Sequence, residues 1–138
     1  MQFTISACTD VGNSKNMNQD SLNAMIANTK QGQAAMAVVC DGIGGLSGGE
    51  IASAYVVTAF KKWFSEGLPS LLGVPFFQEK LEEQWRRVIQ DVNNKILCHA
   101  AEKHFQMGTT LTAILLADGS YYIAQIGDSR AYEITEQL

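Results

Sequence analysis

The sequence predicts an α+β fold with antiparallel sheets, and the order of its hydrophobic periods is the main reason. Three strand-like segments come first, two helical segments follow, and at least three strand-like segments close the chain. Strands that cluster on either side of the helices favour this class, because a doubly wound parallel sheet alternates strands with helices. The length of 138 residues suits one domain, 1–138, with a real core.

Three strands are expected before the first helix. Residues 3–8 alternate apolar and polar side chains, and residues 22–27 form a second short segment. A polar hairpin turn at residues 29–33 then leads into residues 35–40. This last segment is a continuous apolar run, which is typical of a strand buried on both faces.

Two amphipathic helices are expected in the middle of the chain. The first begins after Glu50 and ends at Gly67, and the second runs from about residue 78 to residue 103. Their apolar side chains recur at steps of three and four: Ala52, Val56, Phe60 and Trp63 in the first, and Leu81, Trp85, Val88, Ile89, Val92, Ile96 and Leu97 in the second. We interpret both stripes as faces that pack onto a sheet, in preference to a coiled-coil seam.

Beyond the helices the period returns to two. Strands are expected at residues 109–117 and 121–126, joined by the Asp-Gly pair at 118–119, which is the strongest short hairpin signal in the chain. Residues 127–130 read as a tight turn, and residues 131–134 begin a further strand.

Composition excludes several classes of partner. The net charge of −4 and the isoelectric point near 5.0 argue against nucleic-acid binding. No apolar segment approaches about 18 residues, so no membrane partner is expected. The cysteines, Cys8, Cys40 and Cys98, form no CxxC motif, and we expect reduced, mostly buried thiols in a cytoplasmic protein.

Three acids lie near predicted strand ends: Asp20, Asp41 and Asp128. If they converge at one sheet edge, their mutual repulsion would favour a hard cation such as Mg²⁺ or Mn²⁺. The glycines after Asp41 permit close backbone approach, so a cation could take the Gly42 carbonyl beside the Asp41 carboxylate. Each acid also has a bland interpretation, as a turn residue, a loop cap or an ion-pair partner, and both interpretations stay open.

Four motifs give the sequence a family resemblance. DVGNSKNMNQDS, VVCDGIGGLSGGEIAS, GTTLTAILL and YIAQIGDSRAY, in this order and spacing, resemble the metal-dependent type-2C protein serine/threonine phosphatases, the bacterial members most of all. The resemblance runs from about Ser6 to Ile134 and implies an antiparallel β-sandwich flanked by helices. Family domains are longer, so we expect the N-terminal portion of a single type-2C phosphatase-like domain, with the C-terminal part absent and the sandwich incomplete.

The resemblance also implies a site for two, possibly three, Mn²⁺ or Mg²⁺ ions. The metal-bridging aspartate falls on Asp41, the carbonyl ligand on Gly42, and the acid associated with a third metal on Asp128. The acidic pair of the first motif falls on Gln19 and Asp20. Asp41 and Asp20 would then serve catalysis, in which a metal-activated water attacks the phosphorus of a phosphoserine or phosphothreonine protein substrate.

Three positions depart from the family pattern. Gln19 replaces a common glutamate and supplies no charge, so the second metal should bind more weakly. Lys15 stands where an arginine commonly holds the substrate phosphate, and it lacks the bidentate fork. Ile43 occupies the place of a possible histidine acid, and the histidines present, His99 and His104, are expected to be ordinary surface or boundary residues.

Two functions therefore remain as hypotheses. The first is a metal-dependent phosphoprotein phosphatase, of which this chain is a truncated and weakly active or inactive part. The second is a non-catalytic phosphatase-like fragment that acts as a binding or regulatory module. The exposed surface of an incomplete sandwich would favour self-association or a partner chain that covers it. A generic α+β domain whose Asp-Gly pairs are only turns is the third interpretation.

Overall fold

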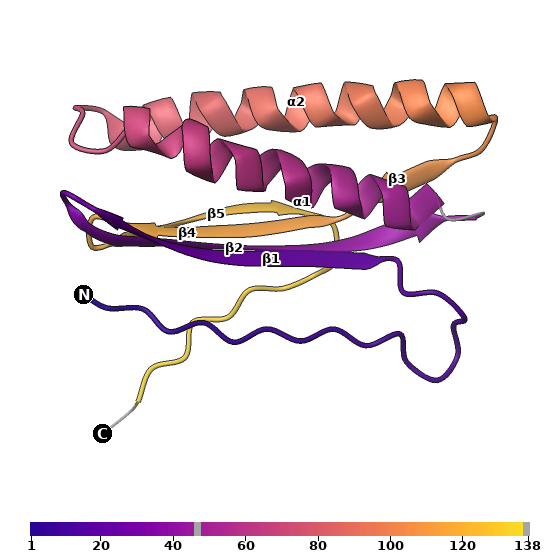
Figure 1. Cartoon of the computed structure of the whole chain (residues 1–138), viewed down its shortest axis with the longest axis horizontal. Helices are drawn as coiled ribbons and strands as arrows, with labels where there is room; N and C mark the ends of the chain where they lie inside the picture. The colour runs from indigo at the N-terminus through magenta and orange to yellow at the C-terminus, as the bar shows by residue number, and fades with distance from the viewer. Residues whose placement is uncertain (46–47, 137–138) are drawn as a thin grey trace.

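One five-stranded antiparallel sheet, covered on one face by two helices, makes up the fold (Figure 1). The computed structural model describes residues 1–45 and 48–136. The elements are β1 (Asp20–Thr29), β2 (Gly32–Gly44), α1 (Gly48–Glu66), the 3₁₀ turn η1 (Leu68–Ser70), α2 (Phe77–Lys103), β3 (Met107–Thr109), β4 (Leu111–Ala117) and β5 (Ser120–Ile126). The sheet order is β1-β2-β4-β5, with β3 paired to the end of β2, and this confirms the α+β class.

The central strand β2 is longer than the segment predicted from the sequence. The predicted segment 35–40 lies inside it, and the strand continues through Asp41 to Gly44. The strand predicted at 109–117 is divided at Thr110 into β3 and β4, so both pair with successive parts of β2. Asp41 is therefore a strand residue that pairs with β1, and not the turn residue that the Asp-Gly pair suggested.

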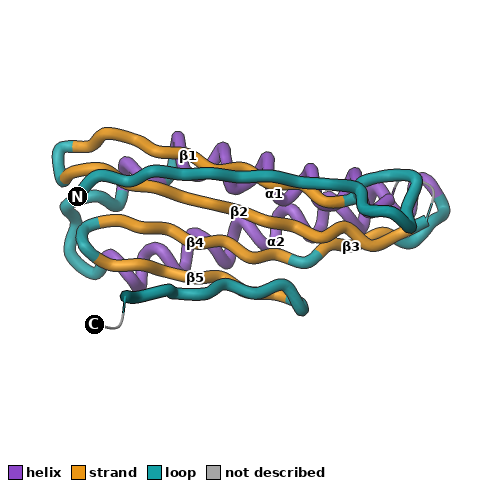
Figure 2. Tube along the Cα trace, turned by 90° about the horizontal axis from the view of Figure 1, so that it is seen from below, coloured by secondary structure: helices purple, strands orange, loops and turns teal. Residues whose placement is uncertain are grey.

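The strands predicted at residues 3–8 and 131–134 are absent. Both segments are extended and lie on the side of the sheet that the helices leave open, and the C-terminal one runs along the outer side of β5 (Figures 1 and 2). Among the described residues, no neighbouring strand supplies a ladder of backbone hydrogen bonds to either segment, and the Phe3 amide instead donates to Gln33 Oε1 at 2.9 Å. An alternating sequence predicts extended backbone, but a strand also needs a partner.

The hydrophobic core lies between the sheet and the helices. Phe60 of α1 is fully buried at its centre and meets the ring of Trp85 of α2 at a centroid distance of 5.7 Å. Side chains at alternate positions of β2 and β4 form the floor: Ala34, Met36, Val38, Cys40, Leu111, Ala113, Leu115 and Ala117. Leu97 was expected in the helical stripe but is exposed, because its neighbour Ile96 takes the buried position of that turn.

The cysteine prediction holds for one residue in three. Cys40 is buried in the core, and this burial raises the pKa of its thiol to about 12, although a hydrogen bond with Thr109 acts in the opposite direction. Cys40 is therefore an inert thiol. Cys8 and Cys98 are exposed, because Cys8 belongs to the extended N-terminal segment and Cys98 lies on the outer side of α2.

The second face of the sheet is apolar and carries no helix (Figure 2). Val39 and Ile123 point to this side and remain 45% and 47% exposed. The same face includes Leu22, Ala24, Ile26, Ala37, Ile114, Leu116 and Tyr121, which share the alternation of Val39 in the strand register. Neither helix in the described part of the chain combines the length and hydrophobicity of a membrane span.

Replacement of Phe60 by alanine should lower the free energy of unfolding by about 3–5 kcal/mol, because it leaves a cavity where α1, α2 and the sheet meet. Leu97→Ala is the matched control, because this exposed side chain leaves no cavity and should cost less than about 1 kcal/mol. Urea denaturation followed by tryptophan fluorescence measures both. Equal losses for the two variants would contradict this assignment of the core.

Candidate metal and phosphate site

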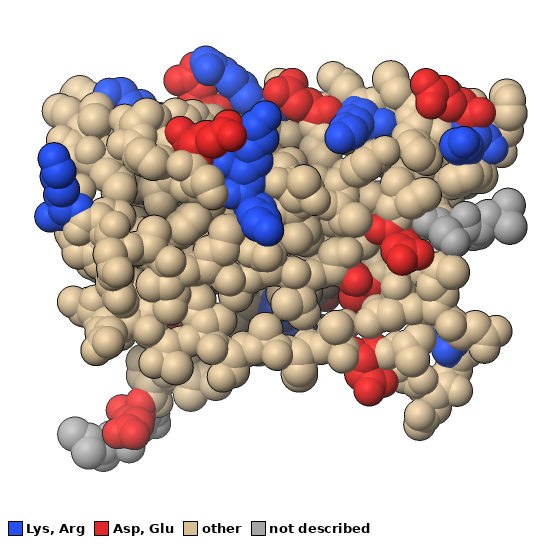
Figure 3. All heavy atoms as spheres, in the orientation of Figure 1, with Lys and Arg blue, Asp and Glu red and all other residues tan. Residues whose placement is uncertain are grey.

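Two of the predicted acids are directly paired on neighbouring strands of the sheet. Asp20 begins β1, Asp41 lies near the end of β2, and the register of the two strands pairs them directly. Directly opposed residues of an antiparallel pair point to the same face, with Cβ atoms about 4.5–5.5 Å apart. Both side chains therefore lie on the face away from the helices, at the end of the molecule where Figure 3 shows several acidic side chains.

The electrostatics of the pair favour a positive partner. Partial burial raises the pKa of the Asp20 carboxyl, and the negative charge of Asp41 and a hydrogen bond with it raise this pKa further. The ammonium group of Lys15 acts in the opposite direction on the pKa of Asp20. Like charges directly opposite in a sheet destabilise it, so a cation at this position would relieve a repulsion that the fold imposes.

The glycines beside Asp41 allow helix α1 to begin against the strand. A Cβ atom on Gly42 would lie 2.1 Å from the Gly49 carbonyl oxygen, and one on Gly49 would lie 2.7 Å from the Gly42 carbonyl carbon. Any larger residue at either position would therefore separate α1 from β2. The glycines thus serve the contact between α1 and β2, and the approach of a cation to the Gly42 carbonyl stays a prediction.

Gln19 is held by hydrogen bonds on both its backbone and its side chain. Its carbonyl accepts from Ser53 Oγ at 2.7 Å and from the Gly42 amide at 3.2 Å, and its Nε2 donates to the Gly44 carbonyl at 2.7 Å. Ser53 is fully buried and also lies 2.9 Å from Ser21 Oγ. These contacts fix the entry to β1, and with it the position of the next residue, Asp20.

The two threonines that follow Gly108 hold the backbone of Asp41. Thr110 donates its amide to the Asp41 carbonyl at 2.9 Å and accepts from the Asp41 amide through Oγ1, also at 2.9 Å. Thr109 Oγ1 donates to the same carbonyl at 3.1 Å. The GTT motif belongs to the resemblance, but its structural role was missed, because side-chain bonds across strands far apart in sequence leave no local pattern.

Asp128 is placed in the loop after β5, one residue before Ser129. Ser129 Oγ lies 3.3 Å from Thr110 Oγ1, so this loop connects to Asp41 through the threonine. Within residues 1–45 and 48–136, no group of three His, Cys, Asp or Glu side chains gathers closely enough to hold a metal ion. The structure thus brings Asp20 and Asp41 together and leaves Asp128 outside the pair, where its metal role stays a prediction.

Lys15 lines a small open cavity beside Asp20. The cavity measures ≈250 Å³ and is formed by the loop of residues 10–15 and 17–20, which includes Gln19. A tetrahedral oxyanion fits this volume, and Lys15 supplies positive charge, but Asp10 and Asp20 also line the cavity and would repel a phosphate unless a cation offsets their charge. The predicted phosphate-binding residue therefore lies next to the predicted metal ligands.

The remaining positions of the sequence argument supply no acid at this end of the sheet. Ile43 is exposed and can donate no proton. His99 is half-buried on α2, where its Nδ1 lies 3.0 Å from the hydroxyl of Tyr55, and His104 is exposed at the end of α2. Both histidines are boundary or surface residues, as predicted.

Comparison with known proteins decides the family. The family model described as protein phosphatase 2C matches residues 12–137. The chain belongs to the protein phosphatase 2C family. It is 34% identical over 126 residues to the serine/threonine phosphatase stp of Listeria monocytogenes, a match that covers 90% of this chain and 47% of that protein. It is 30% identical over 128 residues to the protein phosphatase PhpP of Streptococcus pneumoniae, covering 91% and 48%.

Solved structures of serine/threonine phosphatases superpose on most of this chain. The serine/threonine phosphatase of S. agalactiae superposes with a TM-score of 0.72 at 28% identity, over 89% of this chain and 48% of that one. PstP/Ppp of Mycobacterium tuberculosis gives a TM-score of 0.66 at 30% identity, over 88% and 45%. The chain thus spans about half the length of the curated relatives it matches.

Thr110→Val should loosen the backbone at Asp41. The valine keeps the shape but leaves the Asp41 amide without its acceptor, at a cost of about 1–3 kcal/mol in the free energy of unfolding. Thr112→Val is the matched control, because Thr112 Oγ1 donates to Gln125 and does not touch Asp41. Hydrogen exchange should accelerate at the Asp41 amide in the first variant only. Equal exchange at Asp41 in both variants would refute this role of Thr110.

Asp20→Asn should stabilise the metal-free chain at neutral pH. The folded state raises the pKa of Asp20, so it binds a proton more tightly than the unfolded state. Stability contributed by this group is therefore present at low pH and lost as pH rises through the folded pKa. In EDTA, the variant should gain up to about 1 kcal/mol over the parent above that pKa, and nothing well below it. Thermal denaturation between pH 3 and 8 measures the difference, and a gain that grows toward low pH would contradict it.

Proposed function

We propose that this chain supplies half of the catalytic centre of a phosphoprotein phosphatase that hydrolyses phosphoserine or phosphothreonine esters. The observation that carries the proposal is the cross-strand pair of Asp20 and Asp41, which presents two carboxylates beside a phosphate-sized cavity. Family membership supports the reaction class, and the carboxylate pair supports this end of the sheet as its site.

The donor set fits a hard divalent cation, Mn²⁺ or Mg²⁺. Carboxylate oxygens of Asp20 and Asp41 and the carbonyl of Gly42 are the ligand types that such ions prefer. The raised pKa of Asp20 supports the same choice, because it reports a repulsion that a cation would offset. When bound, the cation would lower the pKa of a coordinated water and stabilise negative charge on the phosphoryl oxygens.

The protein's own residues position the reactants. Asp41 is fixed by the threonine contacts at its backbone, and Asp20 is fixed through Gln19 and the buried Ser53. Lys15 would attract the substrate phosphate into the cavity as a point charge, with less directional control than a bidentate arginine. Gln19 adds an amide without charge, and its Nε2 is already committed to the Gly44 carbonyl.

A second candidate is a phosphatase-like module that binds a phosphoprotein or a partner without turnover. One observation favours it: the described residues bring only two carboxylates together, and Asp128 is not part of the pair. Two carboxylates carry less charge than two or three divalent cations would require. In this case Lys15 and its cavity would bind a phosphate group that is not released as product.

Turnover of p-nitrophenyl phosphate by the purified chain with added Mn²⁺ distinguishes the two candidates. Asp41→Asn should reduce Mn²⁺-dependent turnover by about 10²-fold and abolish Mn²⁺ binding in calorimetry. Asp118→Asn is the matched control, because it changes an aspartate of the β4–β5 turn, which tolerates asparagine. It should leave turnover and binding unchanged.

Each other outcome has a distinct meaning. Mn²⁺ binding without turnover, both in the parent and in the control, would favour the non-catalytic module. Absence of Mn²⁺ binding in the parent chain would overturn the assignment of Asp20 and Asp41 as metal ligands. Turnover that survives Asp41→Asn would show that Asp41 is not part of the catalytic centre.

A further inference from the structure

The loop of residues 127–130, which follows β5, is tied to the sheet although it lies at the surface. Asp128 is exposed within it, and both neighbours of Asp128 contact Thr110. A Cβ atom on Gly127 would lie 2.6 Å from Thr110 Cγ2, and Ser129 Oγ lies 3.3 Å from the hydroxyl of the same threonine. Exposed loops usually have fewer contacts and are more mobile than the elements they connect, so these contacts set this loop apart.

Gln125 binds the backbone of this loop on both sides of Asp128. Its Nε2 donates to the Ser129 carbonyl at 2.6 Å and to the Gly127 carbonyl at 3.5 Å. The first distance is short, and the second is at the limit for a hydrogen bond. Both carbonyls therefore turn toward one amide group, and the chain between them curves around it. The positive φ of Gly127, 104°, permits this curve.

Thr112 fixes which way the Gln125 amide faces. Its Oγ1 donates to Gln125 Oε1 at 2.9 Å, and the two residues are directly paired in β4 and β5. Carbonyl oxygens only accept, so Nε2 must face the loop, and Oε1 is left for the threonine hydroxyl, which can donate. Thr112 is only 8% exposed, so its hydroxyl is largely shielded from water. We call Gln125 together with these three hydrogen-bonded partners the Gln125 clamp.

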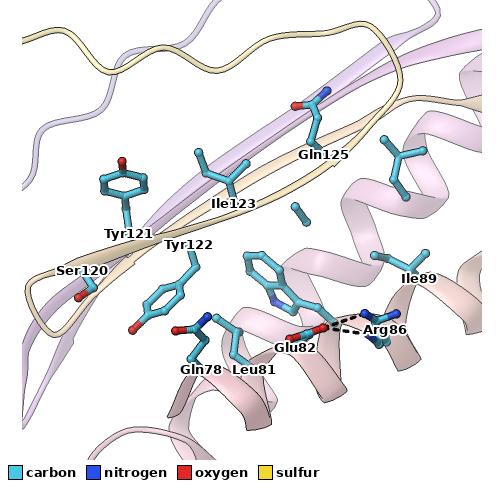
Figure 4. A pocket seen from close by; sticks show the side chains of 13 residues that line it. Gln78, Leu81, Glu82, Arg86, Ile89, Ser120, Tyr121, Tyr122, Ile123 and Gln125 are labelled. Carbon is cyan, nitrogen blue, oxygen red and sulfur yellow. Dashed lines mark hydrogen bonds and ion pairs between the residues drawn. The ribbon is translucent and has the colours of Figure 1, made fainter. Parts of the chain in front are cut away.

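The Gln125 clamp lies on the same face of the sheet as the carboxylate pair. Gln125 points away from α2, to the side where the chain turns back after β5 (Figure 4). Its partner Thr112 is paired on its other side with Val39 of β2. Asp41 lies two residues beyond Val39 and therefore points to the same face. The clamp and the pair are thus neighbours along one surface of the sheet.

Thr110 lies between Asp41 and the loop. Its hydroxyl binds the Asp41 amide at 2.9 Å and also lies 3.3 Å from Ser129 Oγ. Neighbouring strands are about 4.8 Å apart, so two such spacings put the backbone of Asp128 about 10 Å from that of Asp41. At this distance Asp128 is not part of the carboxylate pair, but its charge acts on a cation held there, most strongly at low ionic strength.

The charge of Asp128 is not neutralised by a neighbour. Among residues 1–45 and 48–136 it makes no ion pair, and the guanidinium of Arg130 binds the Tyr132 hydroxyl at 3.3 Å. A carboxylate on a mobile loop would average over many distances from a bound ion, most of them long. On the clamped loop it keeps one distance, so its charge is in place before the ion arrives.

We propose that Gln125 is a positioning residue of the candidate metal site, which holds Asp128 as a fixed negative charge beside the carboxylate pair. Gln125 acts through the backbone of the loop and touches neither the cation nor the phosphate. The role toward a cation rests on the proposed function, whereas the clamp rests on the hydrogen bonds of Gln125. A charge that is already ordered strengthens cation binding without the cost of ordering it.

Amide ¹⁵N relaxation of the 138-residue chain, measured by NMR without metal, tests the clamp. Residues 127–130 should have order parameters of about 0.8 or more, close to those of the strands. Gln125→Met keeps the length of the side chain but removes its donor and its acceptor, so these order parameters should fall below about 0.6. Gln33→Met is the matched control, because it removes an amide that binds Phe3 and Asn28 at the opposite end of β2, and it should leave the loop unchanged.

Mn²⁺ affinity, measured by calorimetry, tests the effect of the clamp on the metal site. At about 10 mM salt, Asp128→Asn should weaken Mn²⁺ binding about two- to fourfold, and at about 0.5 M salt this loss should nearly disappear. In a chain that already carries Gln125→Met, Asp128→Asn should change the affinity by less than about 1.5-fold, because the charge is no longer held in place. A loss of stability alone does not produce such a salt-dependent coupling between the two positions.

The two measurements distinguish failure of the clamp from failure of the proposed function. A loop that is mobile in the parent chain, or equally ordered in the parent and in Gln125→Met, would overturn the clamp. If Mn²⁺ binds and Asp128→Asn has the same effect with and without Gln125→Met, Gln125 does not position the charge and the proposal is wrong. Absence of Mn²⁺ binding by the parent would overturn the proposed function and the role toward a cation, while the relaxation data would still decide whether the clamp exists.

Discussion

The register of the β1–β2 hairpin is the constraint on which the candidate site depends. The turn between Thr29 and Gly32 fixes which residues of the two strands face each other, and nine positions after Gly32 this register sets Asp41 opposite Asp20. A slip of one residue would send every side chain of the slipped strand to the other face. Because Met36, Val38 and Cys40 fill the core, such a slip would expose them, so burial of the core also holds the carboxylates together.

Opposed carboxylates are unfavourable by themselves, and the surrounding backbone contacts keep them in place. Thr110 satisfies both backbone groups of Asp41, and the glycine contact between β2 and α1 leaves no room for the strand to shift. These contacts are made through backbone atoms and one buried threonine, so they stay the same whether the carboxylates are protonated, ionised or bound to a cation. A rigid support of this kind is what a metal centre requires of its ligands.

Much of the architecture follows from local patterns. Both helices, the two hairpins and the sequence of these elements along the chain could be predicted from hydrophobic period and turn residues, because these signals act within a few residues. The motif resemblance predicted Asp20 and Asp41 as metal ligands and Lys15 as the phosphate-binding residue. The structure places these three residues close together. The division of the strand at Thr110, the exposure of Leu97 and the missing ladder at residues 3–8 could not be predicted. Each depends on which distant segment is available as a neighbour, and sequence period does not contain that information.

The carboxylate pair and the apolar face without helices belong to the same side of the sheet. Asp20 and Asp41 are followed along that face by Leu22 and Val39, their neighbours at the next positions of the same register. Any layer that covers these apolar side chains must also approach the carboxylates and exclude water from them. Lower local polarity strengthens both the repulsion between the two acids and the attraction of each for a cation. Covering the sheet and strengthening cation binding are therefore coupled, and a weak site in this chain is the expected consequence of an open face.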